Sequence, residues 1–175
     1  MVIAIAIIAI IAVFAVPSFI EFRERAVIRG SAEQLVTSVA QFRHEGIKRN
    51  RFVTVTFLGD VGSDAWCVGA EEGLDAACDC TAEDSCSVGR FPESVSERRG
   101  TTLTARSGFS DDDAATFDPS TGTLTELGSG GSITLRSPSE RIDYRLRFDL
   151  NPLGRATLCV PGDARALPGY QPCGD

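Results

Sequence analysis

Residues 1–16 read MVIAIAIIAIIAVFAV, a run without a single polar side chain, and Pro17 follows directly. An uninterrupted apolar run of this kind is typical of a membrane segment. As a helix, sixteen residues rise about 24 Å, which is less than the roughly 30 Å of a hydrocarbon core. We therefore expect the span either to include Phe19 and Ile20 or to begin upstream of Met1.

A cleaved secretory signal is the main alternative for this segment. Val13-Phe14-Ala15 has the small-residue pattern of a cleavage site, but no positively charged residue precedes the apolar run, as a secretory signal requires. The helical pattern also continues beyond Pro17. We therefore predict that the segment is retained and that residues 1–20 form a transmembrane part.

Residues 21–50 continue the helix with an amphipathic pattern. Apolar or small residues recur at steps of three and four, while Arg, Glu and Gln occupy the other positions. The predicted apolar face consists of Phe22, Ala26, Ala32, Leu35, Val39, Phe42 and Gly46. We expect one long helix, kinked near Pro17, because proline removes a backbone donor and its ring clashes with the preceding turn.

Residues 51–175 are predicted to form a globular, β-rich head. The sequence alternates with period two over 52–57 and 141–150, which is typical of strands with one buried face. Shorter strand candidates are 101–105, 132–135 and 155–160, and turns rich in Gly and Pro separate them. The pattern predicts an α+β fold in which the long helix packs on an antiparallel sheet.

All cysteines lie in this head, and their even number indicates disulfide bonds and an oxidising compartment. They are Cys67, Cys78, Cys80, Cys86, Cys159 and Cys173. We predict a bridge between Cys159 and Cys173, which are 14 residues apart, so that the bond contributes about 3 kcal/mol on the chain-entropy model. The pairing of the other four cysteines stays open.

The segment 66–86, which carries these four cysteines, is acidic and poor in strand formers, so we expect an irregular loop held by bridges. A metal site is not expected, because the CxC spacing of Cys78 and Cys80 and a single His44 do not form two separated ligand pairs. The chain also lacks a GxSxG or HExxH motif and a nucleophile with a base. We predict no enzymatic activity, no cofactor and no small-molecule substrate.

Charge is unevenly distributed along the chain. Residues 21–51 contain seven Lys or Arg against four Asp or Glu, whereas the remaining residues contain ten against twenty. The head therefore carries a formal charge of −10, and an acidic surface is repelled by phosphate backbones. Nucleic acid is a disfavoured partner.

Several of these segments resemble one known family. Residues 1–19 are similar to the inner portion of the N-terminal helix of type IV pilins. Further segments resemble the FimT/FimU minor pilins and the GspH pseudopilins. They are the helical stretches 32–36 and 40–50, Trp66 with Cys-Val-Gly, the CDC at 78–80, FDPSTGTL at 117–124, and Gly154-Arg155. The resemblance implies a pilin-like fold, with a long kinked helix on an antiparallel sheet head and disulfide-bonded loops.

This resemblance also implies a function, a location and partners. The protein is expected to be a minor pilin that initiates assembly of a type IV pilus or is displayed at its tip. The alternatives are a GspH-like pseudopilin of type II secretion and a FimT-like DNA-binding minor pilin. We expect a single-pass protein of the bacterial inner membrane with a periplasmic head, which enters a surface filament on assembly.

The partners implied by the resemblance are membrane lipid before assembly and other pilin subunits, which pack against residues 1–20 as the filament core. Small residues allow helices to approach closely in such packing. The candidate packing residues are Ala4, Ala6, Ala9, Ala12 and Pro17.

Two departures from the family pattern affect these expectations. The family's cleavage site and its glutamate are absent before Met1, so we expect the reading frame to extend upstream. The GRxR motif of the DNA-binding branch reads Gly154-Arg155-Ala156-Thr157 here, so Arg155 is the one arginine of the motif that is present. Further arginines, at 141, 145 and 147, share a strand face with Asp143 and Asp149, which favours paired charges over a DNA contact.

Overall fold

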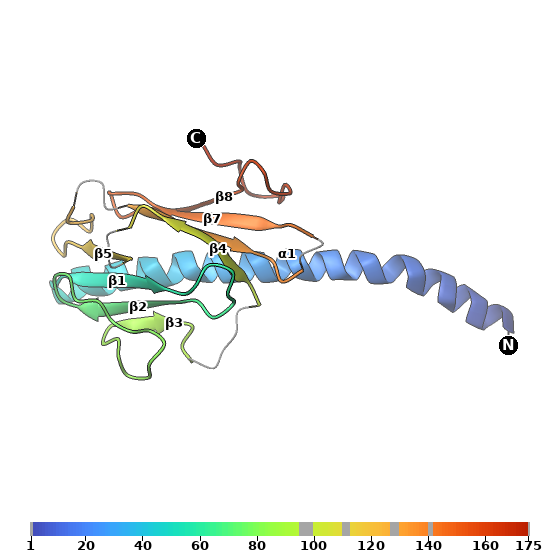
Figure 1. Ribbon diagram of the computed structural model, residues 1–175, viewed down its shortest axis with the longest axis horizontal. Helices are drawn as coiled ribbons and strands as arrows, with labels where there is room; N and C mark the ends of the chain where they lie inside the picture. The colour runs from blue at the N-terminus through green and yellow to red at the C-terminus, as the bar shows by residue number, and fades with distance from the viewer. Residues whose placement is uncertain (1, 95–99, 110–112, 127–129, 140–141, 175) are drawn as a thin grey trace.

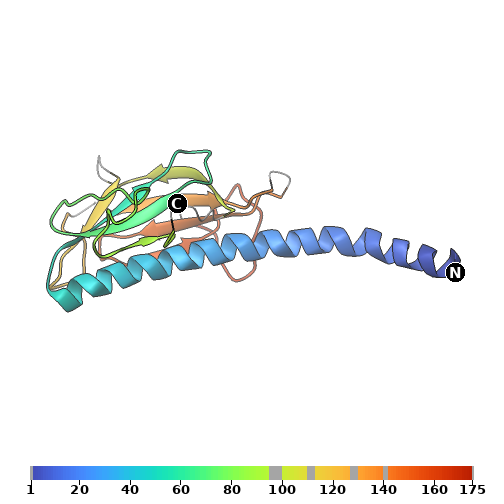
Figure 2. The same cartoon turned by 90° about the horizontal axis from the view of Figure 1, so that it is seen from below.

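The computed structural model describes residues 2–94, 100–109, 113–126, 130–139 and 142–174, with side chains from residue 19 onward. Within these ranges one helix, α1 (Val2–Arg49), precedes eight strands. The head lies along one side of the C-terminal half of α1, and the N-terminal part projects beyond it (Figure 1, Figure 2). The helix is uninterrupted through Pro17, and its projecting part bends as a gradual curve, so the local kink expected near Pro17 is not seen.

From residue 19 onward, where side chains are described, no helix is both long and apolar enough to cross a membrane.

The buried face of α1 repeats at steps of three and four residues. It consists of Glu24, Ile28, Ala32, Leu35, Val39, Phe42 and Gly46. The predicted face is correct from Ala32 onward, but Phe22 is 67% exposed and Ala26 is exposed as well, so both assignments are wrong. Each residue turns a helix by about 100°, so the stripe continues backward from Ala32 through Ile28 and Glu24 instead.

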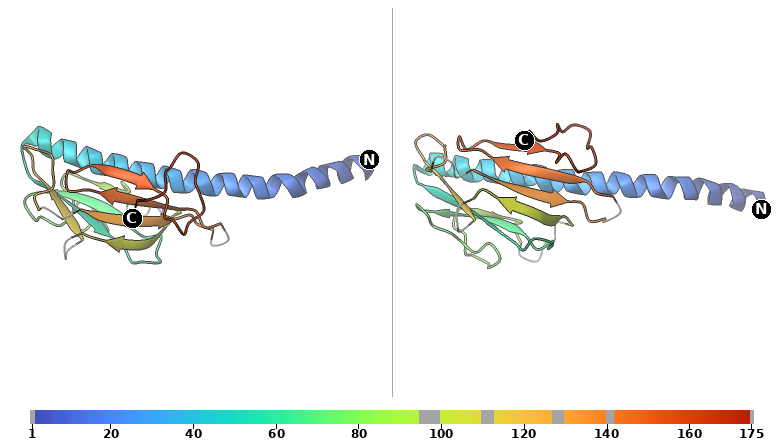
Figure 3. Two further views of the ribbon diagram at one scale, coloured as in Figure 1. Left: turned by 90° about the horizontal axis from the view of Figure 1, so that it is seen from above. Right: turned by 45° about the horizontal axis from the view of Figure 1, so that its top comes forward.

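Two antiparallel four-stranded sheets form the head, whereas the sequence predicted one. The first has the order β3 (Gly89–Phe91), β2 (Cys67–Glu72), β1 (Val53–Leu58), β5 (Ala114–Phe117). The second has the order β4 (Thr102–Ser107), β6 (Gly131–Arg136), β7 (Arg145–Leu150), β8 (Ala156–Cys159). Strands of both sheets contact α1, and both sheets lie on the same side of it (Figure 3).

Five of these strands, β1, β4, β6, β7 and β8, overlap the predicted ones. The other three were not predicted, and β2 falls in the segment 66–86, where an irregular loop was expected; that expectation is wrong for Cys67–Glu72. Residues with weak strand preference form β2 because it is hydrogen-bonded on both sides, to β1 and to β3. Pairing with two neighbours outweighs local preference at such a position.

The core lies between α1 and the inner faces of the two sheets. Its fully buried side chains include Ile28 and Leu35 from α1, Val55 and Phe57 from β1, and Leu135, Leu146 and Phe148 from β6 and β7. The Phe57 and Phe148 rings are 6.1 Å apart at their centroids, so the sheets meet through an aromatic contact. Burial of these side chains seats the C-terminal half of the helix on the head.

A disulfide-bonded loop covers the outer face of the first sheet. Cys67 is bonded to Cys80 and Cys78 to Cys86. The second of these bridges lies against β2 at Gly69, where an added Cβ would be 2.4 Å from the Cys86 Sγ. A glycine is therefore required at this position for the bridge to lie on the strand.

Candidate assembly interface

Large apolar side chains are exposed where α1 leaves the head. Phe19 and Phe22 are each 67% exposed, and Ile20 is 46% exposed. Uncovered apolar surface next to an apolar helix end makes this stretch a candidate contact with protein or lipid. The predicted packing residues Ala4, Ala6, Ala9, Ala12 and Pro17 lie further toward the N-terminus, outside the residues whose side chains are described. Their packing role stays a prediction.

Glu21 joins the helix to the head beside this exposed stretch. Its Oε1 accepts a hydrogen bond of 2.6 Å from the Tyr144 hydroxyl, and the Arg165 guanidinium lies 2.6 Å from the same oxygen. The pKa of Glu21 is lowered, first by the hydrogen bond from Tyr144 and then by the charges of Arg165 and Arg25, against an opposing effect of desolvation. The carboxylate therefore stays ionised at neutral pH and orients both partners.

Glu24 is a second carboxylate that connects α1 to the head. It is only 7% exposed, and its Oε2 accepts a hydrogen bond of 2.9 Å from the backbone N–H of Ser139. A buried carboxylate is costly unless it is hydrogen-bonded, so this contact fixes the rotation of the helix. Sequence analysis missed it, although Glu24 lies at helical spacing from Ile28 and Leu35 on the buried stripe.

Three segments that resemble the family meet near the C-terminal end of α1. The Arg43 Nε donates a hydrogen bond of 2.6 Å to the carbonyl of Gly122, in the turn after β5. Gly154 lies against this turn with φ +74°, and an added Cβ there would be 2.4 Å from the Gly122 carbonyl oxygen and 3.1 Å from the Phe117 ring. These residues therefore have a structural role in joining the helix end to both sheets.

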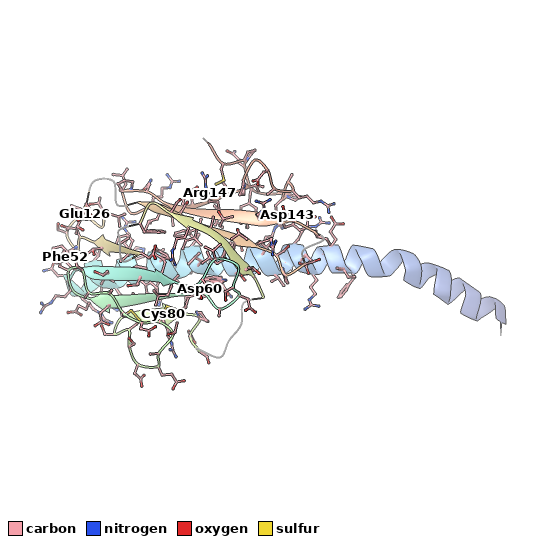
Figure 4. The ribbon with its side chains drawn as sticks, viewed as in Figure 1. Phe52, Asp60, Cys80, Glu126, Asp143 and Arg147 are labelled. Carbon is pink, nitrogen blue, oxygen red and sulfur yellow. A yellow bond between two sulfur atoms is a disulfide. The ribbon has the colours of Figure 1, made fainter. Side chains whose placement is uncertain are left out.

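Two of the arginines considered for DNA contact, Arg145 and Arg147, are paired with acidic side chains. Arg145 is paired with Asp143 and, at 2.8 Å, with Asp163, and Arg147 lies 3.0 Å from Asp149. Figure 4 shows Asp143 and Arg147 along one edge of the head. The predicted pairing of these charges is confirmed, whereas Arg141 lies outside the described residues.

Arg155 is exposed, and its backbone N–H donates to Asn151 Oδ1 at 2.9 Å, which orders the turn before β8.

The third disulfide joins Cys159 to Cys173, the pair expected from the sequence. Asp149 completes a cluster with these two cysteines, and the candidate ligand atoms of the three residues lie within 4.8 Å of one another. Both sulfur atoms are consumed by the disulfide, and a thiolate is the form of cysteine that binds metals. The arrangement is therefore a covalent closure of the C-terminal segment.

Comparison with known proteins matches this architecture to one family. The family model described as Type II transport protein GspH matches residues 31–154, which include the buried stripe of α1 from Ala32 onward and strands β1 to β7. The chain belongs to the GspH family. Its expected membership and its pilin-like α+β fold are thereby confirmed. No curated protein sequence matches this GspH family member.

Two crystal structures of the type IV minor pilin FimU from Pseudomonas aeruginosa are similar in fold. One is 17% identical with a TM-score of 0.55 and covers 83% of this chain and 98% of the FimU chain. The other is 16% identical with a TM-score of 0.52 and covers 79% and 98%. At this identity the likeness establishes a shared fold, a long helix against a β-rich head.

Proposed function

We propose that this GspH family member is a minor pilin, a structural subunit that initiates a type IV pilus or is displayed at its tip. The observation that carries the proposal is the projection of α1 beyond the head, with Phe19, Ile20 and Phe22 uncovered. The shared fold with a type IV minor pilin over 98% of that chain supports it. The role is structural and requires no catalysis.

In this proposal three consecutive segments of the chain have different roles. Residues 1–20 anchor the subunit in the inner membrane and later pack against other pilin subunits, through Ala4, Ala6, Ala9 and Ala12. Residues 21–50 connect this part to the head, and residues 51–175 form the periplasmic head. Three disulfides support a location in an oxidising compartment.

A pseudopilin of type II secretion is the second candidate, favoured by the description of the matching family as a type II transport protein. Such a subunit would use the same helix and head, but in a pseudopilus of type II secretion. Both candidates lead to the same subunit architecture, so a cellular experiment has to separate them.

Deletion of the gene in its native host tests the two candidates against each other. We expect loss of surface pili, measured by electron microscopy and by the amount of sheared pilin, with extracellular protein secretion unchanged. The complemented strain is the control. Loss of secretion with normal pili would replace the first candidate by the second, and an effect on neither would contradict both.

A further inference from the structure

The C-terminal residues 160–174 form a closed segment, here named the clasp, that follows β8 and returns to it. The Cys159–Cys173 bond closes it covalently. Two backbone hydrogen bonds of 2.9 Å, from Val160 to Gln171 and from Cys173 to Val160, hold its two ends together. Leu167 is 2% exposed and joins the core, so the clasp is part of the folded head.

The clasp contacts one stripe of α1 at several points. Arg165 is paired with Glu21 at 2.6 Å, the Arg29 guanidinium donates to the Pro168 carbonyl, and the Tyr170 hydroxyl donates to Glu33. In Figure 3 the red C-terminal segment lies beside the helix near the point where the helix leaves the head.

The helix stripe under the clasp follows a spacing of four residues. Glu21, Arg25, Arg29 and Glu33 succeed one another on the same side of α1, as residues four apart do. Arg25 takes part through the Tyr144 ring, whose centroid lies 5.8 Å from its guanidinium carbon. The Arg165 guanidinium carbon lies 5.2 Å from the same ring, so the ring connects helix and clasp.

Gly30 lies inside this stretch of the helix, between the contacts at Arg29 and Glu33. An added Cβ at Gly30 would meet no described atom within 4 Å, so neither a close approach nor crowding explains a glycine here. A glycine in a helix interior lowers helix stability by about 1 kcal/mol relative to alanine. Gly30 is therefore a weak point, and the clasp contacts span it from Glu21 to Glu33.

We propose that the clasp is a disulfide-dependent brace that stiffens α1 across Gly30, so that the redox state of Cys159 and Cys173 sets the rigidity of the helix where it leaves the head. A dithiol reductant would break the S–S bond by supplying two electrons and two protons, yielding two thiols and its own cyclic disulfide. The inference does not depend on which filament the protein joins.

Hydrogen exchange of the full chain in detergent micelles, read by mass spectrometry, tests this brace. In the double variant Cys159→Ser/Cys173→Ser we expect amides of residues 21–33 to exchange about tenfold faster, and those of 35–46, held by the core, to keep their rates. Gly30→Ala added to this variant should slow the exchange of 21–33 again. Gly162→Ala, where an added Cβ also meets no described atom within 4 Å, is the matched control and should leave the exchange of 21–33 fast.

Unchanged exchange in 21–33 would overturn the proposal, and so would an equal acceleration in 35–46, which indicates general loss of structure. If the double variant does not fold, Arg165→Ala/Tyr170→Phe removes two clasp contacts with the disulfide intact and should give the same local acceleration. Unchanged exchange in that variant would overturn the proposal equally.

Discussion

At the scale of single residues, a few side chains determine how α1 sits on the head. Glu21 binds Tyr144 and Arg165, and Glu24 binds the Ser139 backbone N–H. Both carboxylates lie within one turn of the point where the helix emerges. Because hydrogen bonds to charged groups are stronger than neutral ones, these contacts specify the rotation of the helix in a way that apolar packing alone does not.

Gly154 provides a stability test at this scale. Its φ of +74° and the 2.4 Å approach of an added Cβ to the Gly122 carbonyl oxygen leave no room for a side chain. We expect Gly154→Ala to lower the free energy of unfolding by more than about 1 kcal/mol, measured by thermal unfolding in detergent micelles. Gly162→Ala, where a Cβ meets no described atom within 4 Å, is the control. Equal stability of the two variants would contradict the assignment.

Tyrosine ionisation provides a second test, because the chain contains only two tyrosines. Burial, followed by the hydrogen bond to Glu33, raises the pKa of Tyr170 to about 12, and burial followed by the bond to Glu21 also raises the pKa of Tyr144. Titration followed by tyrosinate absorbance should therefore show both transitions above pH 10 in the folded protein, with that of Tyr170 at about 12.

The same shifts make stability depend on alkaline pH. Below pH 10 both the folded and the unfolded chain keep Tyr170 protonated, so its contribution is fully present. Between about pH 10 and about 12 the unfolded chain ionises first, so the contribution declines as the pH rises. Tyr170→Phe should flatten this decline, and the absence of a wild-type tyrosinate transition near pH 12 would be inconsistent with the raised pKa of Tyr170.

At the scale of secondary-structure elements, α1 has two parts with different surroundings. From Glu24 to Gly46 one stripe is buried against both sheets, whereas Phe19, Ile20 and Phe22 are uncovered. A helix that is covered on one stripe along part of its length and uncovered beyond it suits a subunit that presents its free end to neighbours.

Replacing Ala6 and Ala9 by leucine tests this role of the helix. Larger side chains hold packed helices apart, but they keep the segment apolar. We therefore expect the double variant to stay in the membrane fraction and to be incorporated into filaments poorly, as measured by immunoblotting of sheared filaments. Ala40→Leu, on an exposed part of α1 beside the head, is the matched control. Normal incorporation of the double variant would refute the packing proposal.

At the scale of the whole molecule, charge argues against nucleic acid as a partner. The head is acidic, and Arg145 and Arg147 are paired with neighbouring aspartates. A site for DNA needs guanidiniums that are available to phosphates, since these contacts supply most of the affinity. We therefore expect the head to contact other proteins rather than DNA.

Arg155→Ala is the corresponding test. We expect the variant to assemble into filaments as well as the wild type, and the wild-type protein not to retard duplex DNA at physiological ionic strength. Gel shift at two salt concentrations and filament shearing provide the measurements. DNA binding that weakens with salt and disappears in Arg155→Ala, while assembly persists, would establish the DNA-receptor function instead.

The sequence by itself determined the features that depend on local periodicity. A long helix and a β-rich head could be predicted because their patterns are formed by residues close together in the sequence. These patterns are the apolar run before Pro17, the buried stripe from Ala32 to Gly46, and the alternation in β1 and β7. The even number of cysteines likewise predicted disulfides, although only the Cys159–Cys173 pair was assigned.

The tertiary structure alone decided the features that depend on residues far apart in the chain. The strand β2 exists because β1 and β3 pair with it, and the first two disulfides are set by the loop that lies over Gly69. The division into two sheets and the attachment of Glu21 and Glu24 to the head have the same origin. Each of these features requires residues that only folding brings together. Contacts between residues far apart in the chain produce no periodic pattern in the sequence, so they could not be predicted from it.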